Sequence, residues 1–371
     1  MVKKSGKVRY AVVGLGGIAQ MAVLPAFKHA ENSELAAIVS EDPVKQDALR
    51  KRYKVRKVYA YEQYQECLSS GEVDAVYIAL PNHMHADYSI AAARAGIHVL
   101  CEKPMAMTEE ECGAMIGAAR QAGVKLMIAY RLHFEEGNLE AIRIAQSGKL
   151  GDLRIFTSTF TQQVHKGNVR LQASSGGGTL EDMGIYCINA ARYLFQDEPI
   201  EVYAVRSRGA DSRFKEVEEM TTAILRFPQD RLASFTCSFG ADPVSNYILV
   251  GTKGSLRVEP GYEYQTEIKH YLTIREKTKA RVFPKRDQFA PELIYFSNCI
   301  LKNKKPEPSG EEGLADVRII QALHKSSELN APVKLTPGRR SRRPGPELQI
   351  ERPPIKKPPK LVHAKTASGE S

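Results

Sequence analysis

Three polar side chains stand at helical spacing in the stretch GGGTLEDMGIYCINAARYL, residues 176–194. Asp182, Tyr186 and Asn189 are four and three residues apart, so a helix would present a carboxylate, a phenol and an amide on one face. A phenol whose pKa is lowered by a nearby cation can take the proton of a reacting hydroxyl. We therefore expect Tyr186 to act as acid/base, Asp182 to bind substrate hydroxyls or orient a cation, and Asn189 to support them. The glycines at 176–178 would let the backbone approach a bulky polar ligand.

A glycine loop near the N-terminus indicates what such a helix would serve. The sequence VRYAVVGLGGIAQ is an apolar strand followed by the spacing G-x-G-x-x-A, from Gly14 to Ala19. In the dinucleotide fingerprint Gly14 permits the tight turn, Gly16 lets backbone amides reach a pyrophosphate, and Ala19 lets helix and strand pack closely. Gly17 and Ile18 complete the loop at the helix N-terminus, whose partial positive charge attracts phosphates. The alternative is a glycine turn that binds nothing, and the strand–helix alternation around the loop favours the dinucleotide.

The residues after the second expected strand bear on the choice of dinucleotide. NAD-dependent proteins usually place an acid there to bind the ribose 2′-hydroxyl. Here a neutral Ser40 comes first and Lys45 follows five residues later, a pair that suits a 2′-phosphate. Glu41 or Asp42 could still turn inward and favour NAD. The residues favour NADP, with NAD as the open alternative.

A lysine follows another expected strand, in the sequence HVLCEKPMAMT. Glu102, Lys103 and Pro104 stand at the carboxyl end of that strand, where parallel α/β sheets bind ligands. The Lys103 ammonium can bridge a nicotinamide ribose and a substrate hydroxyl, and it can lower the pKa of a neighbouring acid. Pro104 restricts Lys103 to extended geometry and allows a cis bond between them. With the glycine loop and this lysine in the chain, a catalytic helix at 176–194 is favoured over an ordinary amphipathic helix.

The pattern of apolar residues differs between two parts of the chain. Up to residue 130 short apolar runs alternate with helical patterns, which predicts a parallel sheet of βαβ units. The expected strands of this part are Val8–Val13, Leu35–Val39, Ala75–Ile78, His98–Cys101 and Lys125–Ile128. Thr108 and Glu111 have capping-box spacing, so we expect a helix from there to about Gln121.

After Arg131 strands follow one another with little helix between them, which predicts a mostly antiparallel sheet. The expected strands are 153–161, 200–207, 221–227, 231–239, 246–251, 254–258 and 264–275. Helices are expected at 176–194 and at about 311–329. The fold class is therefore α/β, with a dinucleotide-binding domain at 1–130, an α+β domain with a large mostly antiparallel open sheet at 131–336, and a tail at 337–371.

Composition excludes several classes of protein. The 371 residues include 43% apolar and 26% charged residues, and no apolar run approaches the ~20 residues of a membrane span. Six cysteines without a C-x-x-C pair indicate free thiols in a reducing cytoplasm and no metal site. Of the net charge of +10, the tail alone contributes +6. The remaining +4 gives no support for binding to nucleic acid.

The motifs GLGGIA, EKPMAMT and GGGTLEDMGIYCINAARYL together resemble the Gfo/Idh/MocA oxidoreductases, from about residue 7 to 336. This resemblance implies a Rossmann domain followed by an α/β domain whose open sheet often serves oligomerisation. It also implies NAD(P)-dependent hydride transfer on sugars or polyols by a homo-oligomer, a dimer or tetramer. The motif GGGTLEDMGIYCINAARYL is most similar to the glucose–fructose oxidoreductase branch, which oxidises an aldose at C1 to a lactone.

The resemblance extends to single residues. It implies that Lys103 is the lysine of the family's EKP motif, that Asp182 is its helix aspartate, and that Tyr186 replaces a histidine of the inositol dehydrogenase-like members. The remaining cofactor and substrate contacts that it implies are Ser40, Lys45, Tyr61 beside the adenine, Leu80, Pro81, Asn82 and His85 along the cofactor cleft, and Arg131 and Arg170 near the nicotinamide or substrate. The sequence departs from the family at Val169, where a tryptophan is frequent, and it shows no export signal or N-terminal arm.

Three other functions stay open at this point. Some relatives use NAD transiently to split glycosides, and others are NAD-dependent dehydrogenases of inositols or dihydrodiols. The Tyr186 phenol and the Ser40 loop speak against the glycoside hydrolase. A non-enzymatic cofactor-binding protein is disfavoured because Lys103, Asp182 and Tyr186 are all present.

The tail from Pro337 to Ser371 contains seven prolines and few residues to bury. This composition predicts an extended segment. It would either be solvated and mobile or lie along a neighbouring subunit, where proline lowers the entropic cost of ordering.

Overall fold

The computed structural model describes residues 6–336, 338 and 343–367, which form two compact units. The first unit contains the ranges Met1–Arg131, Asp287–Leu314 and Arg352–Ser371, and the second contains Leu132–Arg286 and Ala315–Glu351. The sequence suggested an unbroken division near residue 130. The structure differs, because the chain returns to the first unit twice after leaving it.

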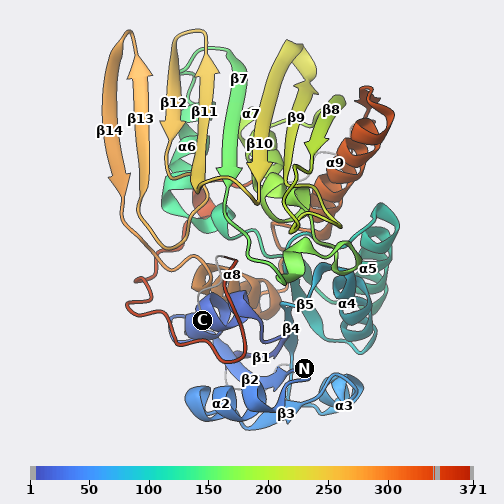
Figure 1. Cartoon of the computed structure of the whole chain (residues 1–371). Coiled ribbons are helices and arrows are strands. Elements are labelled where there is room, and N and C mark those ends of the chain that lie inside the picture. The colour runs from blue at the N-terminus through green and yellow to red at the C-terminus, as the bar shows by residue number, and fades with distance from the viewer. Residues whose placement is uncertain (1–5, 337, 339–342, 368–371) are drawn as a thin grey trace. The chain divides into compact units, whose positions relative to one another are not determined.

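The first unit is built on a parallel six-stranded sheet with the order β3-β2-β1-β4-β5-β6 (Figure 1). Its strands are β1 Val8–Val13, β2 Ser33–Val39, β3 Lys57–Tyr59, β4 Ala75–Ile78, β5 His98–Cys101 and β6 Leu126–Ile128. The order reverses between β1 and β4, and this switch point is where such sheets bind ligands. The predicted parallel sheet is confirmed, and only the three-residue strand β3 was missed.

Local sequence signals account for the helices of this unit. They are α1 Leu24–Ala26, α2 Pro43–Tyr53, α3 Tyr64–Ser69, α4 His85–Arg94, α5 Glu109–Ala122 and α8 Ala290–Leu301. The capping box is confirmed, since the Thr108 side chain accepts from the Glu111 amide and Glu111 bonds back to the cap. The helix after the glycine loop is short and contains Pro25, which is unfavourable inside a longer helix, and it begins with the π-helical turn Ala19–Val23. Helix α8 was not predicted.

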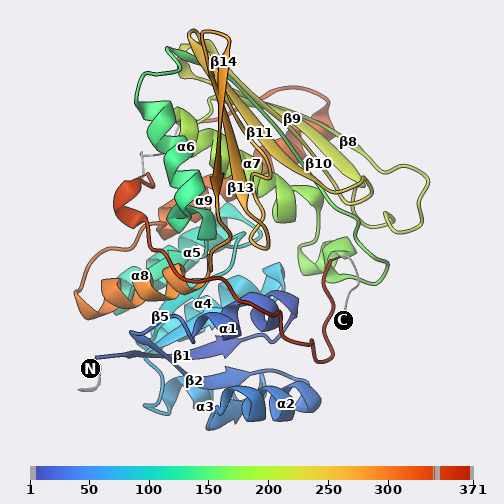
Figure 2. The same cartoon turned by 90° about the vertical axis from the view of Figure 1, so that its left-hand side faces the viewer.

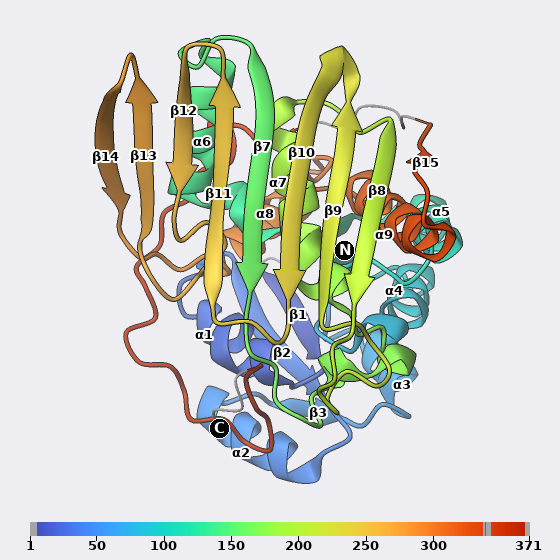
Figure 3. The ribbon, with the colours of Figure 1, turned by 45° about the horizontal axis from the view of Figure 1, so that its top comes forward.

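The second unit is built on a nine-stranded sheet with the order β14-β13-β12-β11-β7-β10-β9-β8-β15 (Figure 3). Neighbouring strands are antiparallel except β7 and β10. The strands are β7 Leu153–Thr161, β8 Glu201–Ser207, β9 Met220–Phe227, β10 Arg231–Ser238, β11 Val244–Gly251, β12 Gly254–Val258, β13 Ile268–Ile274, β14 Lys277–Phe283 and β15 Val333–Lys334. The mostly antiparallel sheet is confirmed, with β14 and β15 in addition.

Helices α6 (Glu136–Gln146) and α7 (Ile185–Phe195) cover one face of this sheet (Figure 3). The other face is open, because residues along β9 alternate strictly between exposed and buried. Helix α9 spans Gly310–Leu329, close to the predicted range. Helix α6 was not predicted, although its strongly amphipathic sequence is that of a surface helix.

The C-terminal segment packs on the chain itself. Residues 343–351 belong to the second unit, and residues from 352 onward lie along the first, where the segment passes α1 (Figure 2). The prediction of a solvated tail is therefore wrong for 352–366, while positions 337, 339–342 and 368–371 lie outside the described residues. Within the described ranges, no helix combines the length and apolarity that crossing a bilayer requires.

Candidate active site

The glycine loop has room for a ligand at one position and none at another. Gly14 has φ +90°, and a Cβ there would lie 2.5 Å from the Ala79 carbonyl oxygen, so only glycine fits this turn. A Cβ at Gly16 would meet no atom within 4 Å, which leaves the space above its backbone open. Ala19 is fully buried where the helix packs on the sheet. These features fit the backbone cradle of a dinucleotide pyrophosphate.

Both carboxylates that follow β2 are engaged by the chain. Glu41 accepts from the backbone amide of Tyr61 at 2.7 Å, and Asp42 caps α2 by accepting from two amides of its first turn, that of Lys45 among them. Ser40 is buried, and its hydroxyl accepts from the Asp42 amide at 3.3 Å. The two acids that could have turned toward a ribose and favoured NAD thus have other partners.

Tyr61 lies beside this turn. Its ring packs edge-on against Tyr88 at 5.8 Å, and burial raises its pKa to about 12. A neutral, partly buried aromatic ring is suited to contact an adenine.

His85 holds two loops together. It is fully buried, and its ring nitrogens lie 2.8 Å from the Pro104 carbonyl oxygen and 2.9 Å from that of Leu80. Burial lowers the pKa of His85, and a neutral ring donates to only one of the two carbonyls at a time. The ring thereby fixes the Leu80–Pro81–Asn82 segment against the Lys103–Pro104 bond, which is cis.

Glu102, the residue before Lys103, is a partly buried carboxyl group with a hydrogen-bond partner in the sheet. The Tyr77 hydroxyl donates to Glu102 at 2.8 Å. Burial raises the pKa of Glu102, although the positive charges of Lys103 and Arg131 oppose this shift. Arg131 is buried and donates to Gln288, which stands just before α8. Sequence reasoning missed Gln288, because nothing in the sequence links it to a residue 157 positions earlier.

Asp182 and Arg170 form an ion pair in the second unit. The Arg170 Nε donates to the Asp182 carboxylate at 2.7 Å, and the Gln162 amide donates to the same oxygen at 3.2 Å. The negative charge of Asp182 is the main reason that the pKa of Arg170 is raised. Both side chains are only partly exposed, at 33% for Arg170 and 20% for Asp182. Gln162, at the end of β7, carries no motif that would have identified it.

Tyr186 stands in the first turn of α7, close to this pair. Its ring packs against Phe160 at 5.6 Å and Tyr262 at 6.0 Å and is partly exposed. The segment before it, Leu180–Gly184, is a π-helical turn rather than the predicted α-helix. Such turns are frequent at functional sites. The structure therefore gathers Asp182, Arg170 and Tyr186 in one unit, beside a partly exposed surface.

The glycine run at 176–178 accommodates the chain's own atoms. A Cβ at Gly177 would lie 2.3 Å from the Arg170 carbonyl oxygen, and one at Gly178 would lie 2.1 Å from the Glu181 carboxylate. The predicted approach to a ligand is replaced by close packing that fixes the Arg170 turn against the start of the helix.

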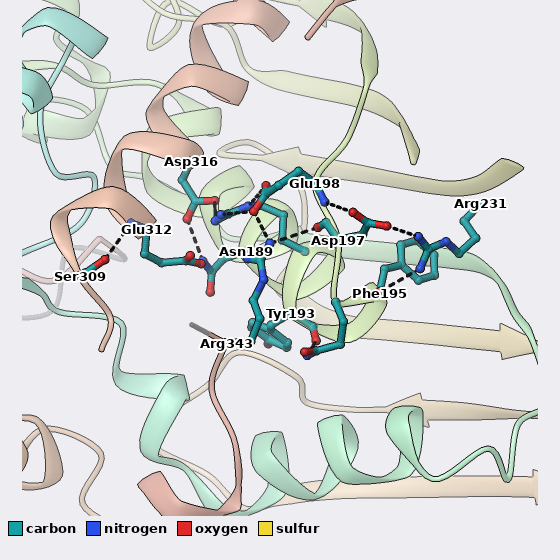
Figure 4. A network of polar contacts seen from close by, with 12 residues as sticks. Asn189, Tyr193, Phe195, Asp197, Glu198, Arg231, Ser309, Glu312, Asp316 and Arg343 are labelled. Atoms are coloured by element: carbon teal, nitrogen blue, oxygen red, sulfur yellow. Dashed lines mark hydrogen bonds and ion pairs between the residues drawn. The ribbon is translucent and has the colours of Figure 1, made fainter. Parts of the chain in front are cut away.

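Asn189 does not face the candidate site. It is buried, accepts from His133 at 2.8 Å and donates to Asp316 at 2.9 Å. Asp316 in turn accepts from Arg192, which also pairs with Glu198 (Figure 4). The expectation that Asn189 supports the acid/base is wrong, because its side-chain amide is bonded to His133 and Asp316 in the interior.

Comparison with known proteins identifies the family of the chain. Residues 8–130 match the family model described as "Oxidoreductase family, NAD-binding Rossmann fold", and residues 138–257 match the "GFO/IDH/MocA C-terminal domain". The NADP(+)-dependent D-xylose 1-dehydrogenase of Haloarcula marismortui is 31% identical over 88% of this chain and 93% of its own length.

Two solved structures are similar along their whole length. The aldose–aldose oxidoreductase of Caulobacter crescentus, complexed with glycerol, has a TM-score of 0.85 and 37% identity, covering 89% of this chain and 100% of its own. A 3-ketoreductase of Actinomadura kijaniata, in complex with NADP and TDP-benzene, has a TM-score of 0.80 and 27% identity, covering 86% and 98%. The chain belongs to the Gfo/Idh/MocA family of oxidoreductases, and its first unit carries the NAD(P)-binding Rossmann fold of that family.

Proposed function

We propose that this protein is an NADP-dependent sugar oxidoreductase that oxidises an aldose at C1 to a lactone, or acts on a related polyol. The observation that carries the proposal is the partly exposed Tyr186 beside the Arg170–Asp182 pair in a chain with a dinucleotide cradle. The D-xylose dehydrogenase and the aldose–aldose oxidoreductase among its relatives support an aldose as substrate.

We assign the roles in the reaction as follows. A bound nicotinamide supplies the hydride acceptor. Tyr186 takes the proton of the sugar hydroxyl, and Lys103 binds that hydroxyl. Asp182, fixed by Arg170 and Gln162, accepts hydrogen bonds from further sugar hydroxyls. The products are lactone, reduced cofactor and one proton.

The preference for NADP rests on the turn after β2. Ser40 offers a hydroxyl, Lys45 offers an ammonium, and the carboxylates of Glu41 and Asp42 are engaged elsewhere. A 2′-phosphate placed there would meet a cation and no unshared carboxylate, which favours its binding.

We further propose that the open face of the nine-stranded sheet joins two copies of the chain. Apolar side chains are exposed along its strands, among them Ile155, Val205, Ile224 and Leu232. Apolar side chains gathered on one exposed face of a sheet are typical of a protein–protein contact surface. Light scattering of the protein and of an Ile224→Lys/Leu232→Lys variant tests this, since a smaller particle is expected for the variant.

The test of the main proposal is a substrate screen. The purified protein is mixed with NADP⁺ or NAD⁺ and with D-xylose, D-glucose, myo-inositol or a glucoside, and both the absorbance of the reduced cofactor and the release of free sugar are followed. We expect reduction of NADP⁺ with an aldose. Cleavage of a glycoside without net reduction would contradict the proposal and support the hydrolase alternative.

A further inference from the structure

The C-terminal segment crosses the surface that carries the glycine loop. We call residues 352–366 the C-terminal strap. At its start, Arg352 donates to the His29 carbonyl oxygen at 3.0 Å and pairs with Glu31. Further along, the Lys360 carbonyl oxygen accepts from Arg52 at 2.8 Å. Both anchors belong to the first unit, so the strap is fastened on either side of the loop's helix.

The most deeply buried anchor is Gln20, the residue directly after the fingerprint. Its side-chain amide donates to the Val362 carbonyl oxygen and accepts from the Val362 amide, both at 2.9 Å. A third hydrogen bond ties the same amide to the Leu15 carbonyl oxygen at 2.8 Å. Gln20 is fully buried. A buried amide of this kind needs its partners, because leaving them unmade costs about 1–3 kcal/mol.

The strap borders the pyrophosphate cradle without filling it. A Cβ built at Gly17 would lie 2.8 Å from the Lys365 carbonyl oxygen, whereas one at Gly16 would meet nothing within 4 Å. His363 lies 3.0 Å from Asp42, the residue that caps α2. The strap thus reaches from the glycine loop to the turn that carries Ser40, and the position above Gly16 stays open.

The charge of the strap suits an anionic neighbour. Residues 352–366 include Arg352 and four lysines, and they contain no Asp or Glu. Four prolines in the same range limit the conformations of the free segment, so its ordering costs little entropy. Cations on a pre-extended segment beside a phosphate cradle would attract a dinucleotide phosphate.

We propose that the C-terminal strap is a wall of the dinucleotide site, fastened through Val362 to Gln20, and that it slows release of the bound cofactor. The inference rests on the NADP binding proposed above. The strap contacts the loop at Gly17 and leaves the space above Gly16 free for a phosphate. It can therefore retain a bound cofactor without occupying the place of that cofactor.

The test compares two variants at one position of the full chain. Val362→Pro removes the backbone donor to Gln20, and Val362→Ala keeps it. NADPH is bound first, and its release is followed by fluorescence after addition of excess NADP⁺. Loss of this partly buried hydrogen bond predicts roughly tenfold faster release for Val362→Pro. The alanine control should remain within about twofold of the parent protein.

A second variant tests the charge without altering the backbone. Lys360→Gln/Lys365→Gln should speed NADPH release at low salt, and the effect should shrink at high salt because ions screen exposed charges. Lys277→Gln/Lys279→Gln, on exposed β14, is the matched control and should leave release unchanged.

Limited proteolysis shows whether NADPH binding stabilises the strap or displaces it. Trypsin cuts after Lys360 and Lys365, and NADPH should slow both cuts if the strap lies over an occupied site. Faster cutting with NADPH, or tighter NADPH binding by Val362→Pro, would show that strap and cofactor compete and would overturn the proposal. Equal release rates in the two Val362 variants would overturn the proposal that the strap slows cofactor release and would leave the proposed function standing. Failure of the parent protein to bind NADPH would overturn the proposed function as well.

Discussion

Arg170 and Asp182 form a charge-assisted hydrogen bond of 2.7 Å, and Asp182 lies in the π-helical turn that precedes Tyr186. The close approach of Gly177 to the Arg170 carbonyl fixes one partner, and the turn Leu180–Gly184 fixes the other. A carboxylate held in this way presents its remaining lone pairs in a defined direction, which is what a sugar hydroxyl requires.

Replacement of this carboxylate by an amide should impair sugar binding. Asp182→Asn removes the charged acceptor of the Arg170 bond, and we expect kcat/KM for the aldose to fall about 10–100-fold. Cofactor affinity should not change, since the dinucleotide fingerprint lies in the first unit. Steady-state kinetics and NADPH titration separate the two effects. Asp152→Asn, whose partner Arg154 is on the surface, is the control that should behave like the parent protein.

Removal of a single hydroxyl tests the acid/base. Tyr186→Phe keeps the ring contacts with Phe160 and Tyr262 and removes the proton acceptor. We expect kcat to fall about 10²–10⁴-fold while the Kd of NADPH is retained. Tyr203→Phe, which removes a hydroxyl bonded to Asn330 at the surface, is the matched control. Turnover close to the parent rate in the Tyr186 variant would refute this role.

Cofactor choice can be tested on one helix. Lys45→Ala removes the ammonium that we propose binds the 2′-phosphate, and we expect the preference for NADPH over NADH, as a ratio of Kd values, to fall about tenfold. Lys51→Ala removes an exposed lysine of the same helix, paired with Asp47, and should leave the ratio unchanged. A ratio that is equally high in both variants would exclude Lys45 as the phosphate ligand.

Sequence periodicity was sufficient for much of the fold. Alternating or continuous apolar runs located β1 and β7 to the residue, and the capping box located α5. Each of these signals is local, because it depends on residues within one turn or one strand of each other. Helices α6 and α8 were missed where the surrounding strands suggested continuous sheet.

Residues of the candidate site could be predicted where they belong to a short sequence motif. They could not be predicted where their position depends on a residue far away in the sequence. Gly14 and Lys103 belong to short motifs with a physical reason for each residue. By contrast, Gln20 bonds to Val362, 342 positions away, and no periodic signal connects a buried amide with a proline-rich tail. Asn189 was misplaced because its partners His133 and Asp316 lie 56 and 127 positions away, and helical spacing carries no sign of them.

Breaking the buried ion pair that Arg192 of α7 makes with Asp316 should destabilise the second unit strongly. Arg192 and Asp316 are fully buried and paired at 2.6 Å, and Arg192 also bonds to Glu198 at 2.7 Å (Figure 4). Asp316→Ala leaves a buried guanidinium short of one partner, so the free energy of unfolding should fall by about 3–5 kcal/mol. Chemical denaturation measures this loss. Asp47→Ala breaks a pair whose members are 62% and 74% exposed, and it should cost at most about 0.5 kcal/mol.

His98, at the start of β5, should make stability depend on pH. Its Nδ1 accepts from the Lys125 amide at 2.9 Å, a bond that requires an unprotonated nitrogen. Burial, together with the charge of Lys125, lowers its pKa from 6.5 to about 4, although Asp74 opposes the shift. The unfolded chain therefore binds a proton at a higher pH than the folded chain does.

The free energy of unfolding should therefore fall as the pH is lowered. The contribution of His98 is complete above pH 6.5 and is lost as pH falls from there toward 4, by at most about 3 kcal/mol. His98→Asn keeps an acceptor for the Lys125 amide and cannot titrate. Unfolding free energies measured from pH 7.5 to 4.5 should therefore fall more steeply for the parent protein than for this variant. Parallel curves would show that His98 is neutral in both states or charged in both, contrary to the hydrogen bond to Lys125.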